Sequence, residues 1–205
     1  ESDTATIVVD SVNDAPVLDN TGGTDFTTIS EDETGGSGDL VSSLVASSIS
    51  DVDRSAVSGI AVTALASGNG TWQYSTDGAT WAGIASASDA SALLLRATDR
   101  LRFIPDGLNA DNGSVTYRAW DQTSGAAGMT ADASIHSGTT AFSTATDTAG
   151  ITVTGVNDAP VLDNTVGTDF TTISEDNLDP NGDLVSSLLA SSISDSDIGA
   201  VAGIA

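Results

Sequence analysis

The acidic residues of this chain are the ones whose types and spacing could do chemistry, and the chemistry that suits them is the binding of a divalent cation. Aspartate and glutamate number 29 against five arginines, which gives a formal charge of -24 at pH 7. Calcium takes about six to eight oxygen ligands, mostly from carboxylates and carbonyls. Clustered carboxylates also relieve their mutual repulsion by binding such an ion. The composition therefore predicts cation binding before any motif is considered.

The candidate ligands fall into short motifs, most of which occur twice in the same order. Each copy has an Asn-Asp pair in a Val-Asn-Asp-Ala-Pro segment, then a Ser-Glu-Asp corner, then an Asp-x-Asp pair. One further aspartate closes a predicted strand. The candidates are Asn13, Asp14, Glu31 (repeated as Glu175), Asp51, Asp53, Asp121, Asn157, Asp158, Asp195 and Asp197. Each motif alone could equally be a solvated turn, because a chain rich in aspartate forms such pairs by chance. A metal site is favoured because these motifs recur in the same order in both copies.

These motifs belong to a long internal repeat. Residues 12–61 recur at 156–205 without a gap, at an offset of 144 residues, and 39 of the 50 aligned positions are identical. A period this long indicates a whole domain, because solenoid units and propeller blades are much shorter. We therefore expect the last strand of one repeat at 1–12, a complete repeat at 13–156 and the first part of the next at 157–205. A chain that covers parts of three successive repeats is more typical of a spacer or adhesive stalk than of a self-contained enzyme.

Short alternating segments separated by Gly and Asp turns predict that each repeat is all-β. We expect an antiparallel β-sandwich, with Asp77-Gly78 as a hairpin turn. Asp39 is a good N-cap for one short helix, since apolar residues follow it at helical spacing. The stretch 122–146 could be a long loop or an added hairpin. The predicted strands are 4–9, 25–29, 60–65, 71–74, 92–95, 101–104, 114–120 and 149–154.

Composition also excludes several functions. The chain has neither cysteine nor lysine, so disulfides, lysine isopeptide crosslinks, thiol catalysis and Schiff-base catalysis are all ruled out. The negative charge repels nucleic acid and anionic lipid, and no apolar run approaches the roughly 18 residues of a membrane span. The only histidine, His136, is expected to be an exposed loop residue, and nothing near it resembles a nucleophile elbow. We therefore expect no enzymatic activity.

Four segments together resemble a known family. The sequence Ile-Thr-Val-Thr-Gly-Val-Asn-Asp-Ala-Pro at 151–160 resembles the calcium-binding linker between cadherin repeats. With Trp-Gln-Tyr-Ser-Thr-Asp-Gly at 72–78, Leu-Arg-Phe-Ile-Pro-Asp at 101–106 and Tyr-Arg-Ala-Trp-Asp at 117–121, it is more similar to the cadherin-like repeats of giant bacterial surface proteins and RTX-type adhesins. The resemblance implies a cadherin-like or immunoglobulin-like sandwich with calcium as cofactor. It also implies an extracellular or cell-surface location after type I secretion, with folding outside the calcium-poor cytosol.

The resemblance further implies that calcium is shared between neighbouring repeats. The second boundary would then use Glu31, Asn157, Asp158, Asp195 and Asp197, with Asp106 or Asp111 from a neighbouring loop. The first would use Asn13, Asp14, Asp51, Asp53 and Asp121. Because the second linker Asn and the Asp-Arg-Glu triplet of cadherins are missing, we expect one or two ions per boundary. The expected partners are adjacent repeats of the same chain, and neighbouring copies through strand addition.

A carbohydrate-binding module is the alternative function. β-Sandwiches commonly bind sugars by stacking them on aromatic faces, and aromatic residues are scarce in this chain. The same side chains could instead fill the core, which we favour because a sandwich needs its few large side chains inside. The candidates for a sugar site are Trp72, Tyr74, Trp81 and Trp120.

Overall fold

The computed structural model describes residues 3–165, 169–189 and 191–205, and it is mostly β-sheet with two short helices. The larger sheet has six strands, in the order β11 (Thr130–Ala131), β8 (Ala92–Arg96), β5 (Gly59–Ala66), β10 (Asp111–Trp120), β12 (Phe142–Thr154) and β2 (Ile29–Ser30). The second has four, in the order β3 (Asp39–Leu40), β9 (Arg100–Ile104), β6 (Thr71–Ser75) and β7 (Ala82–Gly83). All pairings in these sheets are antiparallel except that of β2 with β12, which is parallel.

Two-stranded sheets and the helices complete the chain. β1 (Val17–Leu18) pairs with β4 (Ile49–Ser50), and α1 (Val41–Val45) lies between them in sequence. The same three elements follow the second linker as β13 (Val161–Leu162), α2 (Val185–Leu189) and β14 (Ile193–Ser194). Val17 pairs with Ser50, and Val161 pairs with Ser194 in the same register. The two similar sequences therefore adopt similar local structure.

One hydrophobic core is shared by the two larger sheets. Trp72 of β6 is 1 % exposed, and its ring centroid lies 4.8 Å from that of Phe26 and 5.1 Å from that of Phe103. Side chains of the six-stranded sheet, including Val115 and Tyr117, belong to the same cluster. Alternation in the strands explains this arrangement, because residues two apart point to one face. The aromatic side chains thus hold the two sheets together.

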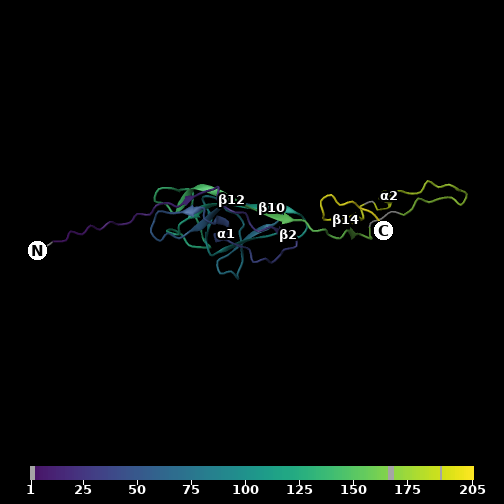
Figure 1. Cartoon of the computed structure of the whole chain (residues 1–205). Helices are drawn as coiled ribbons and strands as arrows, with labels where there is room; N and C mark the ends of the chain where they lie inside the picture. Colours follow the sequence, from purple (N-terminus) through teal and green to yellow (C-terminus); the bar gives the residue numbers. More distant parts are fainter. Residues whose placement is uncertain (1–2, 166–168, 190) are drawn as a thin grey trace.

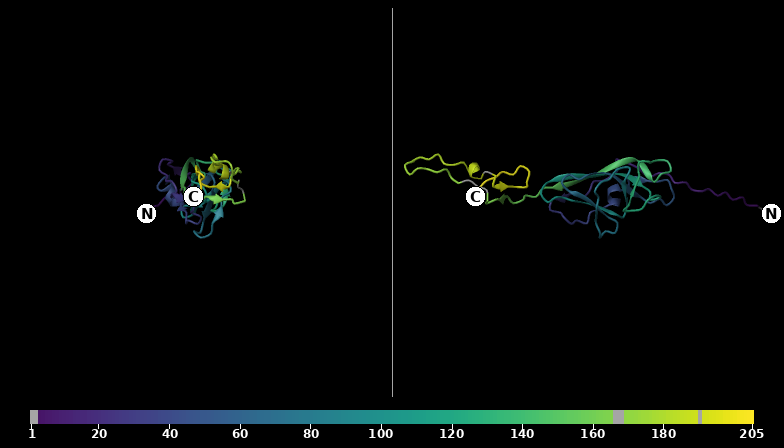
Figure 2. Two further views of the ribbon diagram at one scale, coloured as in Figure 1. Left: turned by 90° about the vertical axis from the view of Figure 1, so that its right-hand side faces the viewer. Right: turned by 180° about the vertical axis from the view of Figure 1, so that it is seen from behind.

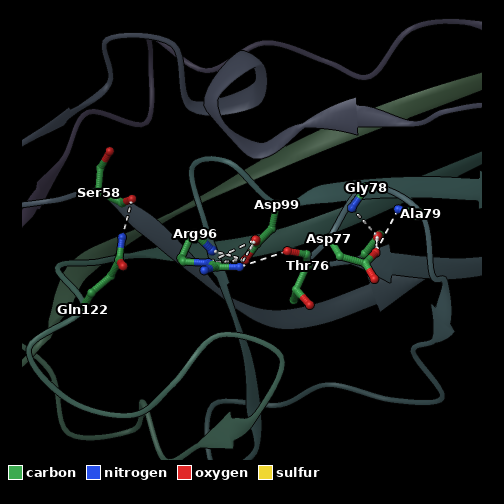
Figure 3. A network of polar contacts seen from close by, with 9 residues as sticks. Ser58, Thr76, Asp77, Gly78, Ala79, Arg96, Asp99 and Gln122 are labelled. Carbon is green, nitrogen blue, oxygen red and sulfur yellow. Dashed lines mark hydrogen bonds and ion pairs between the residues drawn. The ribbon is translucent and has the colours of Figure 1, made fainter.

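A polar network fixes the turns at one edge of this core, as Figure 3 shows. The Arg96 guanidinium bonds to the buried Asp99 carboxylate at 2.8 Å and also donates to the carbonyl of Thr76. Beside it, the Gln122 side chain donates to the carbonyl of Ser58. Asp77 accepts three hydrogen bonds from its own turn through Oδ1. These contacts satisfy polar groups within the fold.

Most of the predicted strands are confirmed, and the helix cap is wrong. The five predictions between residues 60 and 120 match β5, β6, β8, β9 and β10, and 149–154 forms the end of β12. Asp39 does not cap α1, which has no side-chain cap; its carboxylate instead accepts hydrogen bonds from the backbone N–H and hydroxyl of Thr27. Only the end of 25–29 becomes a strand, as β2, while 4–9 forms no strand. The stretch 122–146 holds β11 and the start of β12.

The segments before and after the two larger sheets leave them in opposite directions. In Figures 1 and 2 the N-terminal residues extend from one end, and the chain beyond β12 extends from the other. The second linker, residues 155–160, therefore lies where the sheets end and the recurring elements begin. This arrangement places the acidic candidates of that linker beside the end of β12.

Candidate metal centre

Glu31 is positioned by the parallel pairing of β2 with the end of β12. Ile29 pairs with Val153 and Ser30 with Thr154, and the Glu31 N–H donates to the Thr154 carbonyl at 3.0 Å. The side chain is thereby buried, at 1 % exposure, against the start of the second linker. Its Oε1 accepts the backbone N–H of Val156 at 2.6 Å. Its Oε2 is buried and has no hydrogen-bond partner among the described residues.

The downstream part of the site is a series of backbone-to-carboxylate hydrogen bonds. The Asp158 N–H donates to Asp197 Oδ2 at 2.9 Å, and the Asp197 N–H donates to Asp195 Oδ1 at 2.9 Å. The Asn157 side chain donates to the Asp158 carbonyl at 2.7 Å. The pairing of β13 with β14 holds these two segments together. Asp158 Oδ2, like Glu31 Oε2, is buried without a hydrogen-bond partner in the described chain.

Glu31, Asp158 and Asp197 meet across the second linker. One carboxylate oxygen from each lies within 4.8 Å of the other two. Neither ion pair found among the described residues involves any of the three, so no arginine offsets their charge. Buried charged groups normally have a partner or coordinate a metal. An oxygen-only donor set with two unsatisfied buried oxygens fits a hard divalent cation.

The first linker has the same local arrangement. The Asp14 N–H donates to Asp53 Oδ2 at 2.8 Å, and the Asp53 N–H donates to Asp51 Oδ1 at 2.8 Å. Asn13 adds a hydrogen bond to Asp121 Oδ2 at 2.9 Å, and an open hollow of ≈ 490 Å³ lies among these side chains. Asp51 Oδ2 is buried without a partner in the described chain. No group of three carboxylates meets here among the described residues, so this end resembles the downstream part of the other site.

The remaining candidates have other roles. Asp106 accepts the N–H groups of Leu108 and Asn109, and Asp111 accepts those of Asn69 and Asn112. Neither belongs to the three-carboxylate cluster. Asp195 and Asn157 contact the cluster residues without joining the cluster.

His136 is half-buried, so the expectation that it is exposed is wrong. Its Nδ1 has no hydrogen-bond partner in the described chain. No described serine or carboxylate is hydrogen-bonded to this nitrogen.

The aromatic candidates for a sugar site are largely covered by protein. Trp72 and Trp120 are core residues at 1 % and 2 % exposure, and their ring N–H groups donate to the carbonyls of Ala66 and Ser124. Tyr74 is half-buried and donates to the Gly128 carbonyl. The Arg102 guanidinium lies 4.0 Å from the ring centroid of Trp81 and covers one face. The four rings do not form one exposed stacking surface.

Comparisons with family models, curated proteins and solved structures found no match for this chain. No helix in the described segments is long and apolar enough to cross a membrane. The cluster of Glu31, Asp158 and Asp197 is therefore the strongest functional observation available in the molecule.

Proposed function

We propose that this chain is a calcium-rigidified structural repeat from a large extracellular bacterial adhesin or surface fibre, built from cadherin-like β-sandwich units in tandem. The observation that carries the proposal is the meeting of Glu31 with Asp158 and Asp197 across the second linker. Glu31 belongs to the upstream unit, whereas both aspartates belong to the downstream segment. A cation held by all three joins two successive units of one chain.

The donor set favours calcium over other divalent cations. Oxygen ligands select hard cations, while zinc and copper prefer sites that include nitrogen or sulfur. Magnesium demands nearly ideal octahedral geometry and keeps several waters, whereas calcium tolerates irregular sites with ligands from backbone carbonyls and water. Three carboxylates from segments that are far apart in the sequence form such an irregular site. The backbone N–H groups of Val156 and Asp158 fix two of these carboxylates before the ion arrives.

The mechanism is thermodynamic linkage. An ion that binds the folded boundary and not the unfolded chain stabilises the boundary by RT ln(1 + [L]/Kd). Extracellular calcium modules bind with Kd values of about 10⁻⁴ to 10⁻³ M, which suits the millimolar calcium outside cells. Without the ion, the repulsion among the three carboxylates favours separation of the two units. With it, the angle between them is restricted, and the array behaves as a stiff extender.

Small-angle X-ray scattering of the full chain tests this proposal. The distribution of molecular dimensions should be narrower in calcium than in chelator. Magnesium should narrow this distribution less than calcium does. The double substitution Asp195→Ala with Asp197→Ala should abolish the calcium effect without unfolding residues 13–156. The matched control is Asp51→Ala with Asp53→Ala, which alters the same motif at the first linker and should retain the effect at the second. Identical scattering with calcium and with chelator would contradict the proposal.

A further inference from the structure

The chain contains three Asn-Gly pairs, which are sites of a known spontaneous reaction. They are Asn69-Gly70, Asn112-Gly113 and Asn181-Gly182. In this reaction the glycine backbone nitrogen attacks the asparagine Cγ, ammonia leaves, and a five-membered succinimide forms. Water then opens the ring to aspartate or isoaspartate. The reaction requires a glycine N–H that is free of hydrogen bonds and a backbone that can leave the extended conformation.

The first two pairs are held by the fold. The Gly70 N–H donates to the Ser67 carbonyl at 2.8 Å, and the Asn69 N–H donates to Asp111 Oδ2 at 2.5 Å. Gly70 is also packed tightly, because a Cβ placed on it would lie 2.3 Å from the Phe103 ring.

Asn112-Gly113 lies inside β10 and is paired with Thr152 and Ile151 of β12. Gly113 is buried, and cyclisation there would have to break an extended ladder in the larger sheet. Both pairs are therefore protected.

The third pair has none of these restraints. Asn181 and Gly182 are both exposed, and no hydrogen bond involves the Gly182 N–H within the described residues. Gly182 has a φ of 72°, so the backbone already turns at this point. No atom lies within 4 Å of the position that a Gly182 Cβ would occupy. The side chain and the attacking nitrogen are thus free to approach each other.

We propose that Asn181 is a site of spontaneous deamidation, and that it changes the loop between Glu175 and Asp183. Each event adds a carboxylate, and the isoaspartate product also adds one backbone carbon two residues before Asp183. Asp183 accepts both the N–H and the hydroxyl of Thr171, so the longer backbone strains these two hydrogen bonds.

The first copy of the repeat lacks this chemistry because its counterpart residue is Ser37. Its loop turns at the same place, with Ser37 exposed and Gly38 at a φ of 61°. Gly38 is closely packed, however, because a Cβ placed on it would lie 2.4 Å from the Leu101 carbonyl oxygen. The two copies therefore differ at this position both in the residue before the glycine and in how closely the glycine is packed. This difference does not depend on metal binding.

The test is incubation of the full chain at mildly alkaline pH, followed by mass spectrometry of peptic peptides. We expect the peptide with Asn181 to gain the deamidation mass about tenfold faster than those with Asn69 or Asn112, a difference of about 1.4 kcal/mol in barrier. In concentrated urea the three rates should converge, because only the fold separates them. The matched variant Asn181→Ser, which copies Ser37, should remove the fast phase. Equal rates at the three sites in the folded chain would overturn the proposal.

Discussion

Glu31→Gln is the substitution that separates metal binding from folding most cleanly. Glutamine has nearly the same shape and keeps an oxygen that can accept the Val156 N–H, a bond now made by Oε1 at 2.6 Å. It removes one of the three negative charges in the cluster. We therefore expect the variant to fold normally and to lose the response to calcium. In chelator it should be more stable than the parent chain, because part of the repulsion is gone.

The magnitude follows from the geometry. At an effective dielectric constant of 20, two unit charges that are 4.8 Å apart repel each other by about 3.5 kcal/mol. Glu31 takes part in two of the three repulsions, so they sum to about 7 kcal/mol before screening by water. A single domain is stable by only about 5–15 kcal/mol. The cluster is therefore a substantial cost unless a cation offsets it.

The gain from calcium is smaller and measurable. For a Kd of about 10⁻⁴ to 10⁻³ M, calcium at about 10 mM stabilises the folded chain by about 1.4–2.7 kcal/mol. For a chain of this size, that corresponds to a rise in Tm of about 3–10 °C. Thermal melts followed by circular dichroism, in calcium and in chelator, measure it directly.

The control for this experiment is Glu175→Gln. Glu175 is the counterpart of Glu31 in the second copy, but it is exposed and lies outside the cluster. This variant has the same change in charge and should keep the full rise in Tm, whereas Glu31→Gln should lose it. A Glu31→Gln protein that retains the whole rise would refute the reasoning, because the ion would then be bound elsewhere.

Two further predictions concern the core and the response to alkali. Trp72→Ala should lower the free energy of unfolding by about 3–5 kcal/mol, because it empties the space between Phe26 and Phe103; urea unfolding measures this, and a loss below about 1 kcal/mol would show that the ring is not central to the core. Burial, and then the charge of Asp147, raises the pKa of Tyr117 above its ordinary value near 10. The stability that depends on the protonated phenol is therefore present below pH 10 and is lost as the pH rises beyond it. Tyr117→Phe should lose less stability than the parent chain above pH 10, and equal alkaline slopes in urea unfolding would contradict this assignment.

The strands of the larger sheets could be predicted because their patterns are local. Trp72 and Tyr74 alternate with polar neighbours, and the Asp77 turn follows at once, so a short window of sequence contains the signal. The short strands could not be predicted in the same way. β2 exists through its parallel pairing with Thr154, about 125 residues later, and no local pattern encodes such a contact.

The metal candidates were predictable only through the repeat. The repeat places Glu31, Asp158 and Asp197 among a larger set of candidates, and only the resemblance groups them, together with Asn157 and Asp195, at the second boundary. The structure brings these three carboxylates together. The sequence gives no sign that the Val156 N–H holds Glu31. Nearly every residue has a backbone N–H, so the residue type at 156 does not reveal this contact. The prediction that Asp39 caps a helix fails for a related reason. Its position before a helix suggests a cap, but the neighbouring strand-like segment offers it two donors on Thr27.

Calcium binding at the second linker is the central claim, and isothermal titration calorimetry of the full chain tests it most directly. Titrations with calcium and with magnesium at constant ionic strength should show saturable calcium binding in the range of about 10⁻⁴ to 10⁻³ M, with weaker binding of magnesium. At least one calcium site should disappear in Glu31→Gln and remain in Glu175→Gln. No calcium binding, or the same isotherm for both variants, would contradict the account.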